Sequence, residues 1–262
     1  MKIEVVTLFP DMIQGALGFG IVSRALGRGL LSVGTEDPRA HATDLHRSVD
    51  DRPYGGGPGM VLKPEPLVAA IRAAHARLPV GSLRVYLSAQ GEPFTQARAQ
   101  ELAGLPGLLL VAGRYEGVDE RVVELAIDCE LSVGDYVLSG GELPALTLID
   151  ALARLQPGAL GDERSSLEES FTEGLLEGPH YTRPEVFEGR AVPPVLLSGD
   201  HADIRRWRLA QAVTRTLARR PDLLEGAELT GAARRVLKEL QSGGAEPAAR
   251  AAGAAAGQDR GK

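Results

Sequence analysis

Short apolar runs alternate with helix-like segments along the first 155 residues of the chain. Residues 1–9 hold one acid within an apolar run and are expected to form a first strand. Further buried strands are predicted at 30–35, 84–87, 108–111 and 126–131. Helices are predicted between them, at 15–28, 64–77, 95–105, 118–126 and 144–155. Strands that alternate with helices predict an α/β fold, with a mostly parallel sheet that helices cover on both faces.

The pattern changes after residue 157, which we take as the end of a first domain. Residues 158–178 hold six carboxylates among Ser and Gly, with few apolar positions, and are expected to form a flexible linker. A small helical domain is predicted at 179–241, with helices at 202–219 and 231–241 and with Thr230 as the N-cap of the second. Residues 242–262 are rich in Ala and Gly without apolar anchors and are expected to be a disordered tail.

Three glycine-bearing loops follow predicted strands, at 84–92, 111–121 and 132–142. Each loop mixes glycines with carboxylates and lies next to a tyrosine: Tyr86, Tyr115 or Tyr136. Open α/β sheets bind ligands beyond the carboxyl ends of their strands, so the three loops predict a pocket for a nucleotide-shaped ligand with rings to pack on it. The alternative for any one loop is an ordinary strand-to-helix turn, in which Gly supplies unusual backbone angles.

Composition narrows the class of protein. The chain has 262 residues, of which 44% are hydrophobic and 24% charged, as in soluble globular proteins. No apolar run is long enough to span a membrane, and the N-terminal run lacks the length and cleavage site of a signal peptide. The single cysteine, Cys129, excludes an internal disulfide and a cysteine-cluster metal site. We therefore expect a cytoplasmic protein.

The charge of the chain is unevenly distributed. The formal net charge is −6, yet residues 201–220 carry six arginines against one acid, Asp203. A basic segment on an acidic protein is typical of nucleic-acid contact. A solvated helix face in a chain that uses Arg far more than Lys is the alternative.

The glycine-rich segment 54–59 does not match a nucleotide-phosphate loop. It lacks the Lys and Ser/Thr of a Walker loop, and no G-x-G-x-x-G follows a predicted strand. ATP hydrolysis and dinucleotide redox chemistry are therefore poorly supported. A tight backbone path is the simpler explanation of these glycines.

Five motifs, in order along the chain, resemble the signature of the bacterial tRNA (guanine-N1)-methyltransferases of the knotted SPOUT class. They are DDRPYGGGPGM at 50–60, GRYEGVDER at 113–121, GDYVLSGGELP at 134–144, PHYTRPE at 179–185 and PPVLLSG at 193–199. The resemblance extends from residue 1 to about residue 240. It implies methyl transfer from S-adenosylmethionine to N1 of the guanine immediately 3′ of the tRNA anticodon. It also implies a homodimer with a shared active site and a deep trefoil knot around 86–155, which physical rules alone would not predict.

The resemblance assigns two catalytic residues. Glu169 is the expected general base, at a position where the family has aspartate, and its extra methylene moves the carboxylate by about 1.5 Å. Glu168 is the alternative base. Arg154 is expected to support the base and the guanine O6, although a helix-end arginine that interacts with the helix dipole is the simpler explanation from sequence alone.

The resemblance also places the methyl donor in the three glycine-bearing loops. The residues expected to bind the methyl donor are Tyr86, Leu87 and Ser88 in the first loop, Gly113, Tyr115, Glu116 and Gly117 in the second, and Ser132, Val133, Gly134, Asp135, Tyr136, Val137, Leu138, Gly140, Gly141 and Pro144 in the third. In this interpretation Leu138 and Pro144 pack on the adenine ring, and backbone groups bind its edge. The family has proline where Ala89 stands, which leaves the rigidity of the first loop open.

Further residues are expected to contact tRNA. Asp50 is expected to recognise the guanine next to the target base by accepting hydrogen bonds from the donor edge of that guanine. The alternative is a structural role, in which Asp50 caps a turn. The others are Ser170, Arg205, Arg206 and Arg208. Mg²⁺ is left open as a second cofactor, and no metal-binding residue is predicted.

Two other classes of function remain open at this point. One is an unknotted nucleotide-dependent enzyme that acts on a small molecule, which would leave the basic segment and the acidic linker without a role. The other is a non-catalytic RNA-binding module, which would not need a closed pocket for a small ligand.

Overall fold

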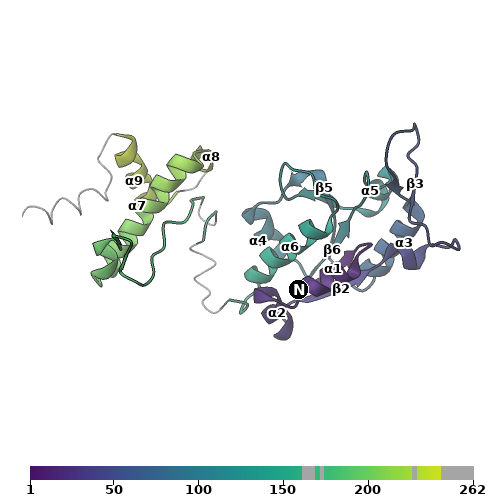
Figure 1. Cartoon of the computed structure of the whole chain (residues 1–262), viewed down its shortest axis with the longest axis horizontal. Helices are drawn as coiled ribbons and strands as arrows, with labels where there is room; N and C mark the ends of the chain where they lie inside the picture. Colours follow the sequence, from purple (N-terminus) through teal and green to yellow (C-terminus); the bar gives the residue numbers. More distant parts are fainter. Residues whose placement is uncertain (161–168, 172–173, 226–228, 243–262) are drawn as a thin grey trace, which may run out of the picture. The chain divides into compact units, whose positions relative to one another are not determined.

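The computed structural model describes residues 1–160, 169–171, 174–225 and 229–242. The chain divides into two compact units, Met1–Glu163 and Arg164–Lys262. In Figure 1 the first unit is coloured purple to teal and holds the large sheet, and the second, green to yellow, is mainly helical. The predicted disordered tail lies outside the described residues, apart from its first residue.

A five-stranded parallel sheet forms the centre of the first unit. Its strands are β1 (Lys2–Val6), β2 (Ser32–Glu36), β5 (Leu83–Pro93), β6 (Gly107–Ala112) and β7 (Cys129–Ser132). Their order in the sheet is β2-β1-β6-β5-β7, and every neighbouring pair is parallel. The predicted α/β class with a parallel sheet is therefore confirmed.

Helices cover both faces of this sheet because its central strands are apolar on both sides. Leu108 and Leu110 of β6 lie in one core cluster, and Leu109 and Val111 lie in the other. The first cluster includes residues of α1 (Pro10–Ala16), α2 (Gly20–Gly27), α4 (Gln96–Ala103) and α6 (Glu142–Leu155). The second includes residues of α3 (Pro64–His75) and α5 (Glu120–Ala126).

Two expected elements differ from the observed ones. The single helix predicted at 15–28 is two helices, because the chain breaks after α1 and Gly20 takes a φ of 64° that other residues adopt at a cost. The strand predicted at 84–87 is longer: Leu87 and Glu92 of β5 both pair with Leu131 of β7. The residues between them form a bulge near the carboxyl end of β5.

A short hairpin, which the sequence analysis did not predict, closes the glycine-rich segment. Its strands are β3 (Asp50–Asp51) and β4 (Val61–Leu62), with Asp50 opposite Leu62. Four glycines between them have positive φ: Gly55, Gly56, Gly57 and Gly59. The glycines therefore allow backbone conformations that few other residues could adopt.

The second unit is built around α7 (His201–Arg219), with α8 (Asp222–Glu225), α9 (Gly231–Gln241) and a hairpin of β8 (Val186–Phe187) and β9 (Arg190–Ala191). The side chain of Thr230 accepts a hydrogen bond from the backbone N–H of Ala233, which confirms it as the N-cap of α9. Val213 and Ala233 are buried in the core of the unit. No helix within the described residues is long and apolar enough to cross a membrane.

The segment predicted as a linker, 158–178, is packed at both ends. Ala159 is buried in the core of the first unit, and the Gly158 carbonyl accepts a hydrogen bond of 2.5 Å from Arg28. Leu175 is buried in the core of the second unit, beside Val213.

Candidate functional site

The three glycine-bearing loops meet beyond the carboxyl ends of β5, β6 and β7 and enclose a cavity of about 390 Å³. This volume lies within the range of about 300–1,000 Å³ that is usual for small-molecule sites. Every residue that the resemblance assigned to the methyl donor lines the cavity, except Asp135. The structure therefore brings together residues from three separate stretches of the sequence.

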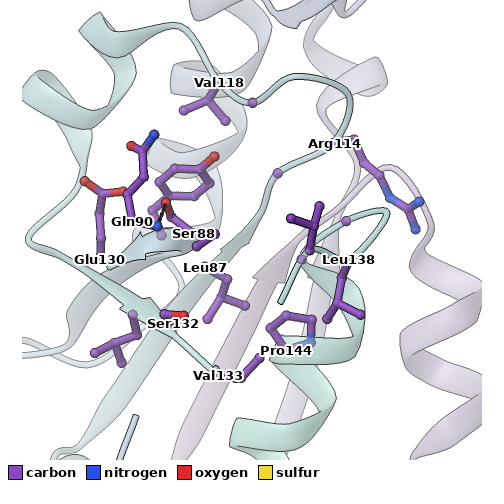
Figure 2. A pocket seen from close by; sticks show the side chains of 18 of the residues that line it. Leu87, Ser88, Gln90, Arg114, Val118, Glu130, Ser132, Val133, Leu138 and Pro144 are labelled. Carbon is purple, nitrogen blue, oxygen red and sulfur yellow. Dashed lines mark hydrogen bonds between the residues drawn. The ribbon is translucent and has the colours of Figure 1, made fainter. Parts of the chain in front are cut away.

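The cavity has an apolar side and a polar side. Figure 2 shows the side chains of Leu87, Leu138 and Pro144 grouped on one side. The polar side chains of Gln90 and Glu130 lie on the other, near Ser88, whose hydroxyl accepts a hydrogen bond of 3.1 Å from the Gln90 N–H. Gln90 and Glu130 line the cavity although the sequence analysis did not select them. Such a site suits a ligand with one flat apolar part and one polar part.

The three tyrosines of these loops are not equivalent. Tyr86 is 9% exposed and belongs to the core beneath the sheet, so its ring forms a wall of the cavity and is not free to stack on a ligand. Burial, together with the nearby charge of Glu130, raises the pKa of Tyr86. Tyr115 and Tyr136 are about half exposed and keep a ring face available.

Two glycines allow the walls of the cavity to approach one another. A Cβ on Gly113 would lie 2.9 Å from the Tyr86 ring, and a Cβ on Gly141 would lie 2.6 Å from the Cα of Ala112. Both distances are shorter than van der Waals contact. A side chain at either position would push the loops apart or fill the cavity.

A buried ionic cluster fastens two of the loops together. The Glu142 carboxylate is fully buried; it accepts hydrogen bonds from Arg114 Nε (2.8 Å) and from the Thr7 hydroxyl (2.7 Å). Arg114 also donates to the Ser139 carbonyl (3.1 Å), and its guanidinium lies 4.4 Å from the centre of the Phe9 ring. Arg114 therefore ties the second loop to the third.

The sequence analysis missed this cluster. Glu142 opens α6, where an acid is ordinarily explained by the helix dipole. Its partner Thr7 stands 135 positions earlier in the chain. Nothing in the local pattern could have paired the two.

Asp50 does not line the same cavity, but its charge acts on Tyr115, which does. Partial burial and the charge of the Asp50 carboxylate raise the pKa of the Tyr115 hydroxyl. The backbone supports the arrangement: the Glu116 N–H donates to the Met60 carbonyl (3.0 Å) and the Leu62 N–H donates to the Gly117 carbonyl (3.0 Å). The first motif is thus attached directly to the second.

The two predicted catalytic residues belong to different units. Arg154 is half-buried in the last turn of α6, and Glu169 is half-buried in the second unit. Beside Glu169, the Ser170 hydroxyl oxygen accepts a hydrogen bond of 3.0 Å from the Glu177 N–H. The roles of Arg154 and Glu169 stay predictions, and the alternative base, Glu168, lies outside the described residues.

The predicted tRNA-contacting arginines lie on α7. Arg205, Arg206 and Arg208 are all exposed, and Arg206 forms an ion pair of 3.2 Å with Asp203. Within the part of the chain that the structure describes, no group of three or more His, Cys, Asp or Glu side chains is placed to hold a metal ion.

A parallel α/β sheet with a two-sided cavity at the carboxyl ends of its strands is typical of proteins that bind a nucleotide-like ligand. Comparison with known proteins identifies the family. The family model described as tRNA (Guanine-1)-methyltransferase TrmD matches residues 1–226. Proteins named tRNA (guanine-N(1)-)-methyltransferase from Salmonella newport, Salmonella agona and Salmonella dublin are each 56% identical over 242 residues, which cover 92% of this chain and 95% of each relative. The chain therefore belongs to the tRNA (guanine-N1)-methyltransferase family, as its five motifs indicated.

Proposed function

We propose that the protein transfers a methyl group from S-adenosylmethionine to N1 of the guanine immediately 3′ of the anticodon in tRNA. The observation that carries the proposal is the cavity at the ends of β5, β6 and β7, with the Asp50 carboxylate near Tyr115 of its wall. The family and the names of its relatives support a guanine N1 in tRNA as the methyl acceptor.

The residues of the cavity fit S-adenosylmethionine. Leu138 and Pro144 offer apolar contact for an adenine ring, and the glycine-rich backbone can come close to a ligand. Glu116 and Glu130 also line the cavity, and their carboxylates favour a ligand that carries positive charge. When bound, S-adenosylmethionine supplies a methyl group that its sulfonium already activates.

The chemical tasks left to the protein are positioning, proton removal and charge stabilisation. Holding the acceptor in line with the donor can lower the barrier by about 7–11 kcal/mol at best. We assign the removal of the guanine N1 proton to Glu169, since a carboxylate suits a general base. Arg154 would stabilise negative charge that develops toward the guanine O6. Asp50 would bind the donor edge of the neighbouring guanine.

We further propose a homodimer whose active site takes residues from both subunits. Apolar side chains are exposed on the first unit at Phe9, Met12 of α1, Phe19 and Leu143 of α6, and α1 packs against α6. Exposed apolar side chains gathered on neighbouring helices mark interaction surfaces. A symmetric pair would cover this face in both copies and would let Glu169 of one subunit act with Arg154 of the other.

The remaining proposals concern organisation. The first unit would contain the trefoil knot around 86–155, and the second unit would be the tRNA-binding domain, with Arg205, Arg206 and Arg208 on its binding face. The boundaries stay as predicted, at 1–157, 158–178 and 179–241. We also propose a cytoplasmic location, because the proposed substrate is tRNA.

The test of the function is methyl transfer from labelled S-adenosylmethionine to tRNA transcripts that differ only in the base 3′ of the anticodon. We expect transfer to the transcript with guanine, recovery of 1-methylguanosine after digestion, and no transfer to the transcript with adenine. Equal labelling of both transcripts would contradict the proposed target. Calorimetry separates the other classes of function: a non-catalytic RNA-binding module would bind tRNA but not S-adenosylmethionine.

A further inference from the structure

The second unit contains a cavity of its own, with a volume of about 420 Å³. It is formed by the segment around Tyr181, the short helix Pro194–Leu197 and the first half of α7. Leu196 and Ile204 supply an apolar base, whereas His180 and Thr182 supply polar groups. All of its lining residues belong to the second unit, and none of them lines the donor cavity.

One aromatic ring lines this cavity, and a second packs beside it. Tyr181 lines it and is 49% exposed, and its ring centre lies 6.2 Å from that of Trp207 on α7, with the planes tilted by 55°. Trp207 holds one side of the Tyr181 ring in place and leaves the rest of the ring exposed. A fixed, half-exposed ring is suited to stacking against another flat group.

Positive charge surrounds the same cavity. Arg183 and Arg208 line it, and Arg205 is exposed on the same stretch of α7. One acid, Glu185, also lines the cavity, whereas nearby Asp203 is paired with Arg206, and Glu177 is paired with His180 at 2.7 Å. The balance of charge therefore favours an anionic ligand.

We propose that this cavity binds a single unstacked nucleobase of the tRNA, stacked on Tyr181, with Arg183 and Arg208 on the flanking phosphates. The inference rests on the proposed tRNA substrate and adds a second contact site to it. Sequence-specific RNA recognition acts mostly on bases that are splayed out and stacked on aromatic rings. His180 and Thr182 can form hydrogen bonds with a base edge, whereas an extended peptide or a lipid chain would not need this combination of a ring, polar groups and arginines.

Trp207 provides a direct probe of the site, because it is the only tryptophan in the chain. We expect its fluorescence to be quenched in a saturable way when the full-length protein is titrated with a tRNA transcript. The midpoint should match the Kd from filter binding. tRNA binding without any change in this fluorescence would overturn the proposal.

Substitutions of Tyr181 test the stacking. Tyr181→Ala should weaken tRNA binding by about 5- to 150-fold, the range measured when a base loses its aromatic partner, and Tyr181→Phe should stay within about twofold of wild type. Phe187→Ala is the matched control, since Phe187 is an exposed aromatic residue of the same unit that does not line the cavity. Donor affinity by calorimetry should not change in any of these variants. If the Tyr–Trp pair serves only local packing, Tyr181→Ala will lower the melting temperature with wild-type tRNA affinity, and the proposal fails.

Arg208→Gln tests the phosphate contact and does not depend on the Tyr181 variants folding. The slope of log Kd against log salt should fall by about 0.7 for a single-stranded contact. Arg234→Gln, an exposed arginine of α9 outside the cavity, should change the slope less. Equal changes in the two variants would refute the assignment. Failure of the wild-type protein to bind or methylate tRNA would instead refute the proposed function, independently of this cavity.

Discussion

Single residues hold the donor cavity in shape, and Glu142 is the clearest example. Its carboxylate is buried and is shared between Arg114 and Thr7, so three separate segments depend on one side chain. A buried charge that loses its partner is costly, whereas an exposed ion pair contributes little. The Glu142–Arg114 pair should therefore contribute more to stability than the arginine–carboxylate pairs on the surface.

We predict that Glu142→Gln will destabilise the protein by about 2–4 kcal/mol, because it leaves the partly buried Arg114 without its counter-charge. It should also weaken donor binding, since Arg114 ties two cavity loops together. Urea unfolding and calorimetry with S-adenosylmethionine measure the two effects. Glu101→Gln removes an exposed pair with Arg98 and should cost less than about 1 kcal/mol. Similar losses of unfolding free energy in both variants would show that the burial of Glu142 does not increase its contribution to stability.

The second residue-scale prediction concerns the general base. Glu169→Gln should slow the chemical step by about 10²–10⁴-fold and leave donor affinity intact, because only the proton acceptor is removed. Glu169→Asp should keep substantial activity, since it restores the residue found in the family. Single-turnover methyl transfer at saturating donor, measured against pH, gives the rates. Glu168→Gln is the control, and a larger loss there than in Glu169→Gln would move the base to Glu168.

At the scale of elements, one charged pair fastens the amino ends of β5 and β7, opposite the ends that form the cavity. Asp128, just before β7, accepts hydrogen bonds from the Arg84 side chain (3.0 Å from Nε) and from the Arg84 backbone N–H (2.8 Å) at the start of β5. These bonds and the charge of Arg84 lower the pKa of Asp128, although burial acts in the opposite direction. The pair aligns β5 with β7, and both strands lead into loops of the cavity.

A carboxylate with a lowered pKa stabilises the fold above its unfolded pKa of about 3.9, and this contribution is lost as the pH falls through the lower folded value. Asp128→Asn should therefore cost about 1 kcal/mol at pH 7, discounted for partial exposure, and the difference from wild type should shrink at pH 3. Urea unfolding at both pH values tests this. Glu124→Gln, an exposed change on α5, should show little effect at either pH. If the stability difference between wild type and Asp128→Asn were the same at both pH values, the lowered pKa of Asp128 would not contribute to stability.

At the scale of the whole molecule, the proposed site needs more than one unit of the chain. The donor cavity and Arg154 belong to the first unit, whereas Glu169, Ser170 and the arginines of α7 belong to the second. The exposed apolar side chains on α1 and α6 offer a surface for a second copy. A shared active site would explain both features.

We predict that Arg154→Ala and Glu169→Ala chains, each inactive alone, will recover methyl transfer when mixed and allowed to exchange subunits. Each mixed dimer would contain one intact pair of Arg154 and Glu169 at one of its two sites. Two different affinity tags allow the mixed dimers to be isolated and assayed. Isolated mixed dimers without activity would refute the shared site.

The local pattern of the sequence by itself determined most of the helices and strands. Apolar runs and caps such as Thr230 act within a few residues, so β1, β6, α3 and α9 lie where the sequence placed them. The motifs likewise identified the lining of the donor cavity, because each loop follows its strand directly in the chain. The break between α1 and α2 was missed, although Gly18 and Gly20 stand there.

Only the tertiary structure decided how these pieces meet. Thr7 reaches Glu142 because β1 lies beside β6 in the sheet, and Asp50 comes near Tyr115 because backbone bonds join residues 60–62 to residues 116–117. The bulge in β5, where two residues pair with one residue of β7, depends on how these two strands are paired in the sheet. The second cavity forms where Tyr181 packs against Trp207, 26 positions later. Contacts of this kind follow from packing and chain topology, whereas local sequence pattern reports on the conformational preferences of neighbouring residues alone.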